Sequence, residues 1–393
     1  MDIKKEALDI QHDIIKWRRD LHKTPETGLL LPLTRGYIIK ELEKMDIKYT
    51  TYETHSGIVC IIGDENKGIC IGVRADIDGL SVNEEIESEF KSQNSNMHAC
   101  GHDAHAAILL GTAKLLKKYE DLLNGCVKLI FQPGEEGPGG AYPMVLDGVL
   151  ENPKVEKIFA LHVGSLAGKE KNGSITVNYK NTFAADDQLY IKIKGKGGHG
   201  SMPHQTVDPV AIAGNVIMSL QNIVSREVSP HNSAVVTIAS VFSSNDTYNV
   251  IPEYVELKGT IRTLNYETRD FVFDRIRKIV DYTVNGFRGE YELEFRDGYP
   301  PLINSKEVTE EFIISAKKIV DECDINIMEN SLMGGEDAAF FFEKIPGSYF
   351  FLNTPSEHNG VLYPAHNSKF KIDETYLYLG SALFTQVVMD LIG

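Results

Sequence analysis

Cysteine, uninterrupted apolar sequence and positive charge are all scarce in this chain of 393 residues. The five cysteines are odd in number and lie far apart, which excludes the disulfide framework of small secreted domains. Lys and Arg number 40 against 56 Asp and Glu, and the resulting net charge of −16 argues against nucleic acid or an anionic membrane as a partner. Because no apolar run approaches the ~20 residues of a membrane span or forms a signal-peptide core, we expect a cytoplasmic protein.

Length and composition predict a globular protein with more than one domain. Hydrophobic residues make up 42% and charged residues 24% of the sequence, as in an ordinary folded protein. A chain of 393 residues exceeds the size of a typical single domain. We therefore expect two domains.

Short apolar runs and one long amphipathic stretch dominate the first 165 residues. Cys126–Phe131 and Lys157–Val163 are predicted as buried strands, and Asp103–Tyr119 is predicted as a helix. The runs 58–62 and 68–73 are separated by a Gly-Asp-Glu-Asn turn signal, which predicts that they form a hairpin. This mixture indicates an α/β domain in which helices cover a sheet.

The middle of the chain has a different periodicity, beginning with a half-exposed strand pattern at Asp187–Lys194. The following elements are a helix at Asp208–Arg226, strands at Ser233–Val241 and Glu253–Leu264, a helix at Thr268–Phe287 and a strand at Glu290–Arg296. The order βαββαβ is that of the ferredoxin-like unit, so we expect an inserted domain at about 184–296. Beyond it the α/β pattern returns, with a helix at Glu307–Cys323 and a strand at Gly347–Leu352.

The segment Met97–His105 contains one thiol and three imidazoles within nine residues. These side chains bind transition metals, and here they directly precede the apolar helix pattern. With only 12 His and 5 Cys in the chain, such a cluster indicates a metal or catalytic site.

Further polar residues follow the predicted strands at the point where each strand ends. Asp76 and Asp78 follow the second strand, Glu135 and Glu136 follow the third, and His162 ends the fourth. Because sites in α/β sheets form outside the carboxyl ends of the strands, these side chains are expected to converge. Adjacent residues on extended backbone point in opposite directions, so one glutamate can bind a metal while the other acts as a general base.

A set of motifs in a fixed order now identifies a family resemblance. The set is VRADIDGL (73–80), MHACGHDAH (97–105), FQPGEEGPGGA (131–141), LHV (161–163), GHGSMPH (198–204), NVIP (249–252), GTIRTL (259–264), GGEDAAFF (334–341) and HN (366–367). Together these motifs resemble the aminoacylase/carboxypeptidase G-like dinuclear metallohydrolases. The most similar branch contains hippurate hydrolase, indoleacetyl-amino-acid hydrolases and N-acetyl-diaminopimelate deacetylase.

The resemblance implies a domain layout and a dinuclear centre. It implies a catalytic α/β/α domain with a mixed sheet, formed by 1–183 and 297–393, and an inserted lid or dimerisation domain at 184–296. The cofactors would be two divalent metal ions, with zinc, manganese, nickel and cobalt left open. The implied metal ligands are Cys100, His102, Glu136, His162 and His366, with the Cys100 thiolate bridging the two ions.

The resemblance also implies roles in catalysis and substrate binding. Glu135 would be the general base that takes a proton from a metal-activated water, and Asp76 would orient a metal ligand. His199 would stabilise the oxyanion in an active site, its own or that of a partner subunit. Asn249 and Arg262 would bind the substrate carboxylate.

Four hypotheses follow for the activity. The first is an amidohydrolase of N-acyl L-amino acids with acetyl, benzoyl or indoleacetyl groups. The second is a carboxypeptidase or dipeptidase that uses the same site on short peptides, and the third is the narrower deacetylation of N-acetyl-diaminopimelate. The fourth is an inactive relative that acts as a binding protein. Ala338 replaces a Phe that is frequent in relatives, which bears on the acyl group, and a homodimer is expected from pairing of the inserts.

Overall fold

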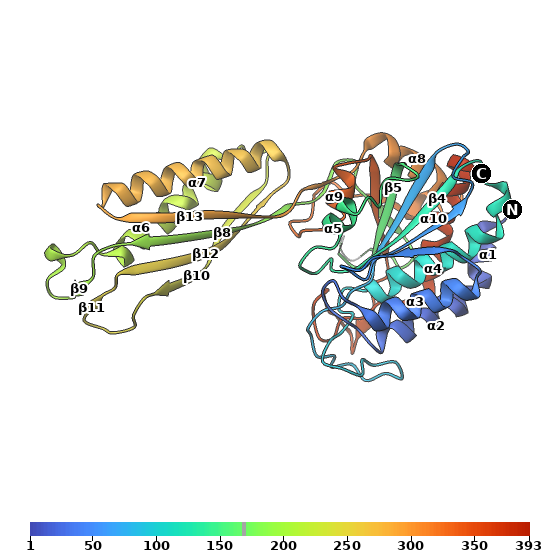
Figure 1. Cartoon of the computed structure of the whole chain (residues 1–393), viewed down its shortest axis with the longest axis horizontal. Coiled ribbons are helices and arrows are strands. Elements are labelled where there is room, and N and C mark those ends of the chain that lie inside the picture. Colours follow the sequence, from blue (N-terminus) through green and yellow to red (C-terminus); the bar gives the residue numbers. More distant parts are fainter. Residues whose placement is uncertain (167–169) are drawn as a thin grey trace. The chain divides into compact units, whose positions relative to one another are not determined.

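The computed structural model describes residues 1–166 and 170–393 and divides the chain into two compact units (Figure 1). The first unit consists of Met1–Thr182, Ile303–Asn330 and Asp337–Gly393. The second unit consists of Phe183–Leu302 and Ser331–Glu336. The predicted insert at 184–296 thus falls within the second unit, which extends a few residues further and also takes in a short later segment.

The first unit is built on an eight-stranded mixed sheet. Its order is β1 (Tyr49–Thr51), β2 (Ile58–Gly63), β4 (Cys126–Gln132), β3 (Cys70–Asp76), β5 (Val155–Gly164), β16 (Gly347–Asn353), β6 (Ile175–Val177) and β15 (Ile325–Ile327). The four central strands β4, β3, β5 and β16 run parallel to one another, whereas β2 is antiparallel to β4 and β6 is antiparallel to β16. All residues of β3, β4 and β16 are buried, as expected for parallel strands covered on both faces.

Helices supply the cover of this sheet. They are α1 (Ile3–Asp9), α2 (Gln11–His22), α3 (Pro32–Lys44), α4 (His102–Lys118), α5 (Ala141–Leu146), α8 (Lys306–Ala316), α9 (Ala339–Phe342) and α10 (Leu377–Ile392). Helix α4 packs on β3, and α2 and α10 pack on α4. The predicted helix at Glu307–Cys323 is shorter than expected and ends at Ala316.

By length and composition, the segment Glu374–Ile392 is apolar enough to cross a membrane. It is not an uninterrupted apolar run, because Glu374 and Asp390 lie within it. In the structure 61% of the most apolar 18-residue window of this segment is buried, and α10 packs against α1, α4 and α8. This is the environment of a core helix.

The predicted hairpin between β2 and β3 is wrong. The chain does turn after Gly63, but β4 lies between the two strands and pairs with both. Asp64 N–H donates to the Gly125 carbonyl at 2.9 Å, and Cys126 N–H donates to the Ile69 carbonyl at 3.2 Å, so the connection passes across the start of β4. A turn signal shows that the chain reverses and does not show which strand becomes its neighbour.

The second unit contains a four-stranded antiparallel sheet of order β10 (Ala234–Ser243), β12 (Tyr254–Thr263), β8 (Ala185–Lys194) and β13 (Glu290–Tyr299). Two helices, α6 (Pro209–Asn222) and α7 (Tyr266–Gly286), complete the order βαββαβ along the chain. Side chains of the sheet and both helices form a separate hydrophobic core, which includes Ile191, Val216 and Ile276. The remaining short strands are β7 (Asn181–Phe183), β9 (Gly198–His199), β11 (Val250–Ile251), β14 (Leu302–Ile303), β17 (Glu357–His358) and β18 (Val361–Leu362).

Candidate metal centre

The loop that enters α4 brings Cys100 and His102 to the carboxyl end of the central strands. Gly101, between them, has φ +90°, and a Cβ there would lie 2.7 Å from Cγ2 of Val163. Both the backbone conformation and the lack of space therefore require glycine at this position. The resulting turn places Cys100 just before the helix and His102 in its first turn.

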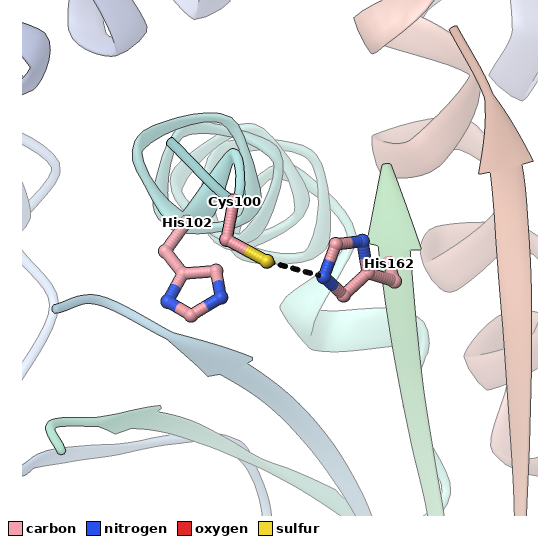
Figure 2. A group of neighbouring side chains, drawn as sticks. All are labelled: Cys100, His102 and His162. Atoms are coloured by element: carbon pink, nitrogen blue, oxygen red, sulfur yellow. Dashed lines mark hydrogen bonds between the residues drawn. The ribbon is translucent and has the colours of Figure 1, made fainter. Parts of the chain in front are cut away.

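Three buried side chains meet at this point (Figure 2). Sγ of Cys100 lies 3.3 Å from Nε2 of His162, which projects from β5. One potential ligand atom from each of Cys100, His102 and His162 lies within 4.8 Å of the other two. Sulfur and imidazole nitrogen at such separations form a donor set suited to one transition-metal ion.

Hydrogen bonds determine which nitrogen of each ring faces the cluster. Nδ1 of His162 donates to the Val163 carbonyl at 2.6 Å, and Nδ1 of His102 donates to Oδ1 of Asp78 at 3.3 Å. In the neutral rings the lone pair is then on Nε2. Among the described residues, the buried Nε2 of His102 has no hydrogen-bond partner. This orphaned atom and the carboxylate behind its ring are typical of a histidine that binds a metal.

A second group of potential ligands consists of Cys100, Glu136 and His366, again with one atom from each within 4.8 Å of the others. Nε2 of His366 lies 3.1 Å from Oε1 of Glu136. His366 has φ +69°, a conformation that costs energy for a residue other than glycine, and its N–H donates to the Ala99 carbonyl at 2.8 Å. Both groups contain Cys100, so its sulfur belongs to each of the two sets of potential ligands.

The electrostatics of the cluster favour a cation. Burial, followed by repulsion from Glu136, Glu135 and Asp76, raises the pKa of the Cys100 thiol well above its usual value. Burial lowers the pKa of His102, but Asp76 and Asp78 outweigh it and raise that pKa to about 10. The residues present thus fit two divalent ions, whose charge would offset these carboxylates and deprotonate the thiol.

Asp76 and Asp78 differ in what they contact. Asp76 hydrogen-bonds Nδ1 of His105 and accepts from Nη1 of Arg74 at 2.9 Å, whereas its carboxylate is 3.7 Å from His102. Nε2 of His105 accepts from the Val163 N–H at 2.9 Å, so both ring nitrogens of His105 are used within the protein. The carboxylate that hydrogen-bonds the predicted ligand His102 is that of Asp78.

Asp78 was named with Asp76 at the end of the same strand and expected to converge with the other polar residues, but it was assigned no role in the site. Besides His102, its carboxylate accepts from the backbone N–H groups of Glu135 and Glu136, both at 3.1 Å. The spacing of Asp76 and Asp78 places both on one face of an extended strand, which is the only sequence signal for this role. Asp78 therefore connects the histidine loop with the glutamate turn.

Glu135 lies beside both groups of potential ligands. Its side chain is largely buried, and Oε2 lies 3.9 Å from Nε2 of His102. Oε1 of Glu136 is also 3.9 Å from that nitrogen. Both glutamates of the turn therefore face the cluster. This differs from the prediction that adjacent side chains on extended backbone point in opposite directions.

The three predicted site residues of the second unit lie at two separate positions within that unit. His199 pairs with Val250, and the Asn249 carbonyl accepts from Gly200 N–H at 2.7 Å, so His199 and Asn249 are brought together. Both are exposed. Arg262 lies opposite Asp186 at the start of β8, whereas His199 follows the end of β8. The guanidinium of Arg262 forms an ion pair with Asp186 at 2.5 Å.

The chain matches known proteins over most of its length. The model of the peptidase family M20/M25/M40 matches residues 72–390. The chain is 36% identical over 384 residues to thermostable carboxypeptidase 2 of Saccharolobus solfataricus, covering 96% of this chain and 95% of that protein. It is also 36% identical over 383 residues to N-acetyldiaminopimelate deacetylase of Priestia megaterium, covering 96% and 97%.

The fold is also similar to that of a crystallised relative. The YXEP protein of Bacillus subtilis, described as a dinuclear metal binding peptidase from the M20 family, matches with a TM-score of 0.82 and 31% identity. The match covers 98% of this chain and 99% of that chain.

Proposed function

The chain belongs to peptidase family M20/M25/M40 and is a metal-dependent hydrolase of amide bonds, and we propose that it cleaves N-acyl L-amino acids to a carboxylate and a free amino acid. The observation that carries this proposal is the pair of ligand groups that share Cys100, with Glu135 beside them. The proposed ligands are Cys100, His102, Glu136, His162 and His366. Two divalent ions of zinc, manganese, nickel or cobalt would occupy the centre.

When bound, the two cations would supply the positive charge that polarises the scissile carbonyl and acidifies the attacking water. The Glu135 carboxylate accepts the proton of that water as its oxygen attacks the carbonyl carbon. Glu135 then donates this proton to the amine nitrogen as the C–N bond breaks. Asp78 holds the backbone of Glu135 and the ring of His102 in place throughout.

His199 is proposed as the hydrogen-bond donor to the oxyanion, in its own active site or that of a partner subunit. Its Nδ1 accepts from the Ser201 N–H at 3.2 Å, so Nε2 carries the proton of the neutral ring. Asn249, beside it, is proposed to contact the substrate carboxylate. The neutral ring therefore has one N–H donor, on Nε2, available for the proposed contact with the oxyanion.

Arg262→Ala is expected to raise KM by about 10- to 100-fold for substrates with a free carboxylate, because it removes a charge-assisted hydrogen-bond pair. The corresponding methyl-ester substrates should show little change. Steady-state kinetics on acid and ester pairs measure the effect. Arg296→Ala, an exposed arginine on β13 of the same sheet, is the control and should leave KM unchanged. An unchanged KM for the acid in Arg262→Ala would reject this anchor.

A substrate panel tests the proposed activity directly. The metal-reconstituted protein is assayed on N-acetyl, N-benzoyl and indoleacetyl amino acids beside plain dipeptides and N-acetyl-diaminopimelate, with detection of the released amine. Preference for acylated amino acids supports the proposal. Preference for dipeptides favours the second candidate, a carboxypeptidase or dipeptidase. This candidate is supported by the 36% identity to a carboxypeptidase, which equals the identity to a deacetylase. Inactivity on the whole panel with metal bound contradicts both.

We also propose a homodimer formed through β10. This strand is at the edge of its sheet, and Val241 and Phe242 on it are 58% and 57% exposed. An exposed apolar edge strand can pair with the same strand of a second copy about a two-fold axis. Phe242→Glu is expected to shift the protein from dimer to monomer in sedimentation velocity. Tyr282→Glu, at an exposed position of α7, should leave the dimer intact, and a wild-type monomer would contradict the proposal.

A further inference from the structure

Asp337, in the GGEDAA segment, is a fully buried acceptor beneath the glutamate turn. Its Oδ2 accepts from the backbone N–H groups of Gly140 at 2.8 Å and Ala141 at 2.9 Å. Nε2 of Gln132 donates to both carboxylate oxygens at 2.7 and 2.8 Å, and Nη2 of Arg74 donates to Oδ1 at 3.0 Å. One carboxylate from the C-terminal part of the chain thus accepts hydrogen bonds from three separate segments, namely β3, the end of β4 and the start of α5.

All of these donors except Arg74, which lies on β3, stand at the two ends of the turn that carries the glutamates. The turn begins at Gln132, where β4 ends, and finishes at Ala141, where α5 begins. Asp78 holds its middle through the N–H groups of Glu135 and Glu136. Asp337 accepts hydrogen bonds from both ends of the turn. The middle and the ends of the turn are therefore each bound to a buried carboxylate, the middle to Asp78 and the ends to Asp337.

We propose that Asp337 is a positioning residue for the general base, acting on Glu135 by holding the two ends of the turn Gln132–Ala141. The inference rests on the proposed function of Glu135 and adds a residue from a distant part of the chain to that site. Proton transfer needs the base within hydrogen-bond reach of the water, and a displacement of about 1 Å can cost about 100-fold in rate. A turn fixed at both ends keeps the carboxylate within that tolerance.

The position requires an acceptor that donates nothing. Gly140, Ala141, Gln132 and Arg74 all present hydrogens to Asp337. Asparagine has the same shape, but its amide group would direct two hydrogens against these donors. At least one buried donor would then lose its partner, and the turn would relax to satisfy it.

Asp337→Asn is therefore expected to keep two metal ions per chain, to lower kcat by about 10- to 100-fold and to change KM little. Hydrogen exchange in a peptide spanning residues 132–141 should become about tenfold faster or more, because hydrogen bonds to a charged acceptor protect Gly140 and Ala141. Elemental analysis, steady-state kinetics on the substrate that the panel identifies, and exchange measured by mass spectrometry provide the three readouts.

Two further variants separate positioning from general stability. Asp187→Asn alters an equally buried carboxylate that binds Arg269 in the second unit, and it should lower the melting temperature without changing kcat or exchange at 132–141. The double variant Gln132→Glu/Asp337→Asn exchanges the positions of the amide and the carboxylate. The amide oxygen introduced at position 337 can still accept from Gly140 and Ala141. The carboxylate introduced at position 132 can accept from that new amide and from Arg74, so much of the lost kcat should return.

Wild-type kcat in Asp337→Asn, or unchanged exchange at 132–141, would overturn the inference. Loss of metal in that variant would also overturn it, because Asp337 would then serve metal retention. A wild-type protein that cleaves no panel substrate contradicts the proposed function instead, and the exchange measurement still decides whether Asp337 holds the turn.

Discussion

Glu135→Gln is expected to keep both metal ions bound and to lower kcat by about 10²- to 10⁴-fold, the usual contribution of a positioned general base. Glutamine preserves the shape of the side chain and the backbone N–H that Asp78 holds, so the turn should remain in place. It cannot accept the proton of the attacking water. The loss should therefore appear in kcat, while KM and the metal content of the purified variant stay near those of the wild type.

Two comparisons make this result specific. Glu136→Gln, at the next position, should instead lose metal, because Glu136 is grouped with Cys100 and His366 as a potential ligand. Glu151→Gln, an exposed change elsewhere in the same unit, should alter neither metal content nor kcat. Full activity of Glu135→Gln with two ions bound would end the assignment of Glu135 as the general base.

Cys100→Ser is expected to weaken metal binding by more than the ~10- to 100-fold that a residue supporting a ligand contributes, with activity falling in parallel. Cys100 belongs to both groups of potential ligands, so its loss affects both ions. A serine hydroxyl is a much poorer anion and a harder donor than a thiolate between two dications. Elemental analysis after dialysis against a metal buffer measures the occupancy.

The chain offers a matched control for the thiol. Cys60 is also fully buried, and burial raises the pKa of its thiol, but it lies on β2 within the hydrophobic core. Cys60→Ala should retain two ions per chain and normal kcat, with some loss of stability from the cavity. Two tightly bound ions per chain in Cys100→Ser would refute the bridging role.

The removal of metal should also lower stability. Ions that bind the folded chain and not the unfolded chain stabilise it by mass action, and their charge would offset part of the negative charge of Glu135, Glu136 and Asp76. Burial contributes most to the raised pKa of the Cys100 thiol, and the same carboxylates raise that pKa further. This coupling explains why occupancy must be measured before any kinetic loss is interpreted.

Much of the fold was predictable because periodicity is a local property. The buried strands β4 and β5 and the helix α4 were predicted within a few residues, since a short continuous apolar run indicates a strand covered on both faces and apolar side chains at period 3.6 indicate a helix against a core. The pairing of β2 was not predictable. Its turn signal described only the chain reversal after Gly63, and β4 occupies the position beside β2 through contacts between segments far apart in the sequence.

The candidate site shows the same division. Residues that carry unusual chemistry, such as Cys100 and His102, stand out in the sequence because thiols and imidazoles are rare and were found clustered. Asp78 and Asp337 carry common side chains. Asp78 follows a predicted strand and Asp337 lies in the motif GGEDAAFF, but the sequence assigned neither of them a role. Their importance comes from the backbone N–H groups they accept from, at Glu135 and Glu136 and at Gly140 and Ala141.

By itself the sequence determined which side chains can bind metal and move protons, and in which motifs they occur, because those properties belong to the residues. The motifs already implied a bridging Cys100, and the structure places it in two groups of potential ligands. Only the tertiary structure decided that Asp78, rather than Asp76, hydrogen-bonds His102. It also decided that Asp337 lies beneath a turn whose Gly140 is 197 positions earlier in the chain. Distances between groups far apart in sequence depend on how strands and helices pack, and packing is settled by the whole core rather than by any one segment.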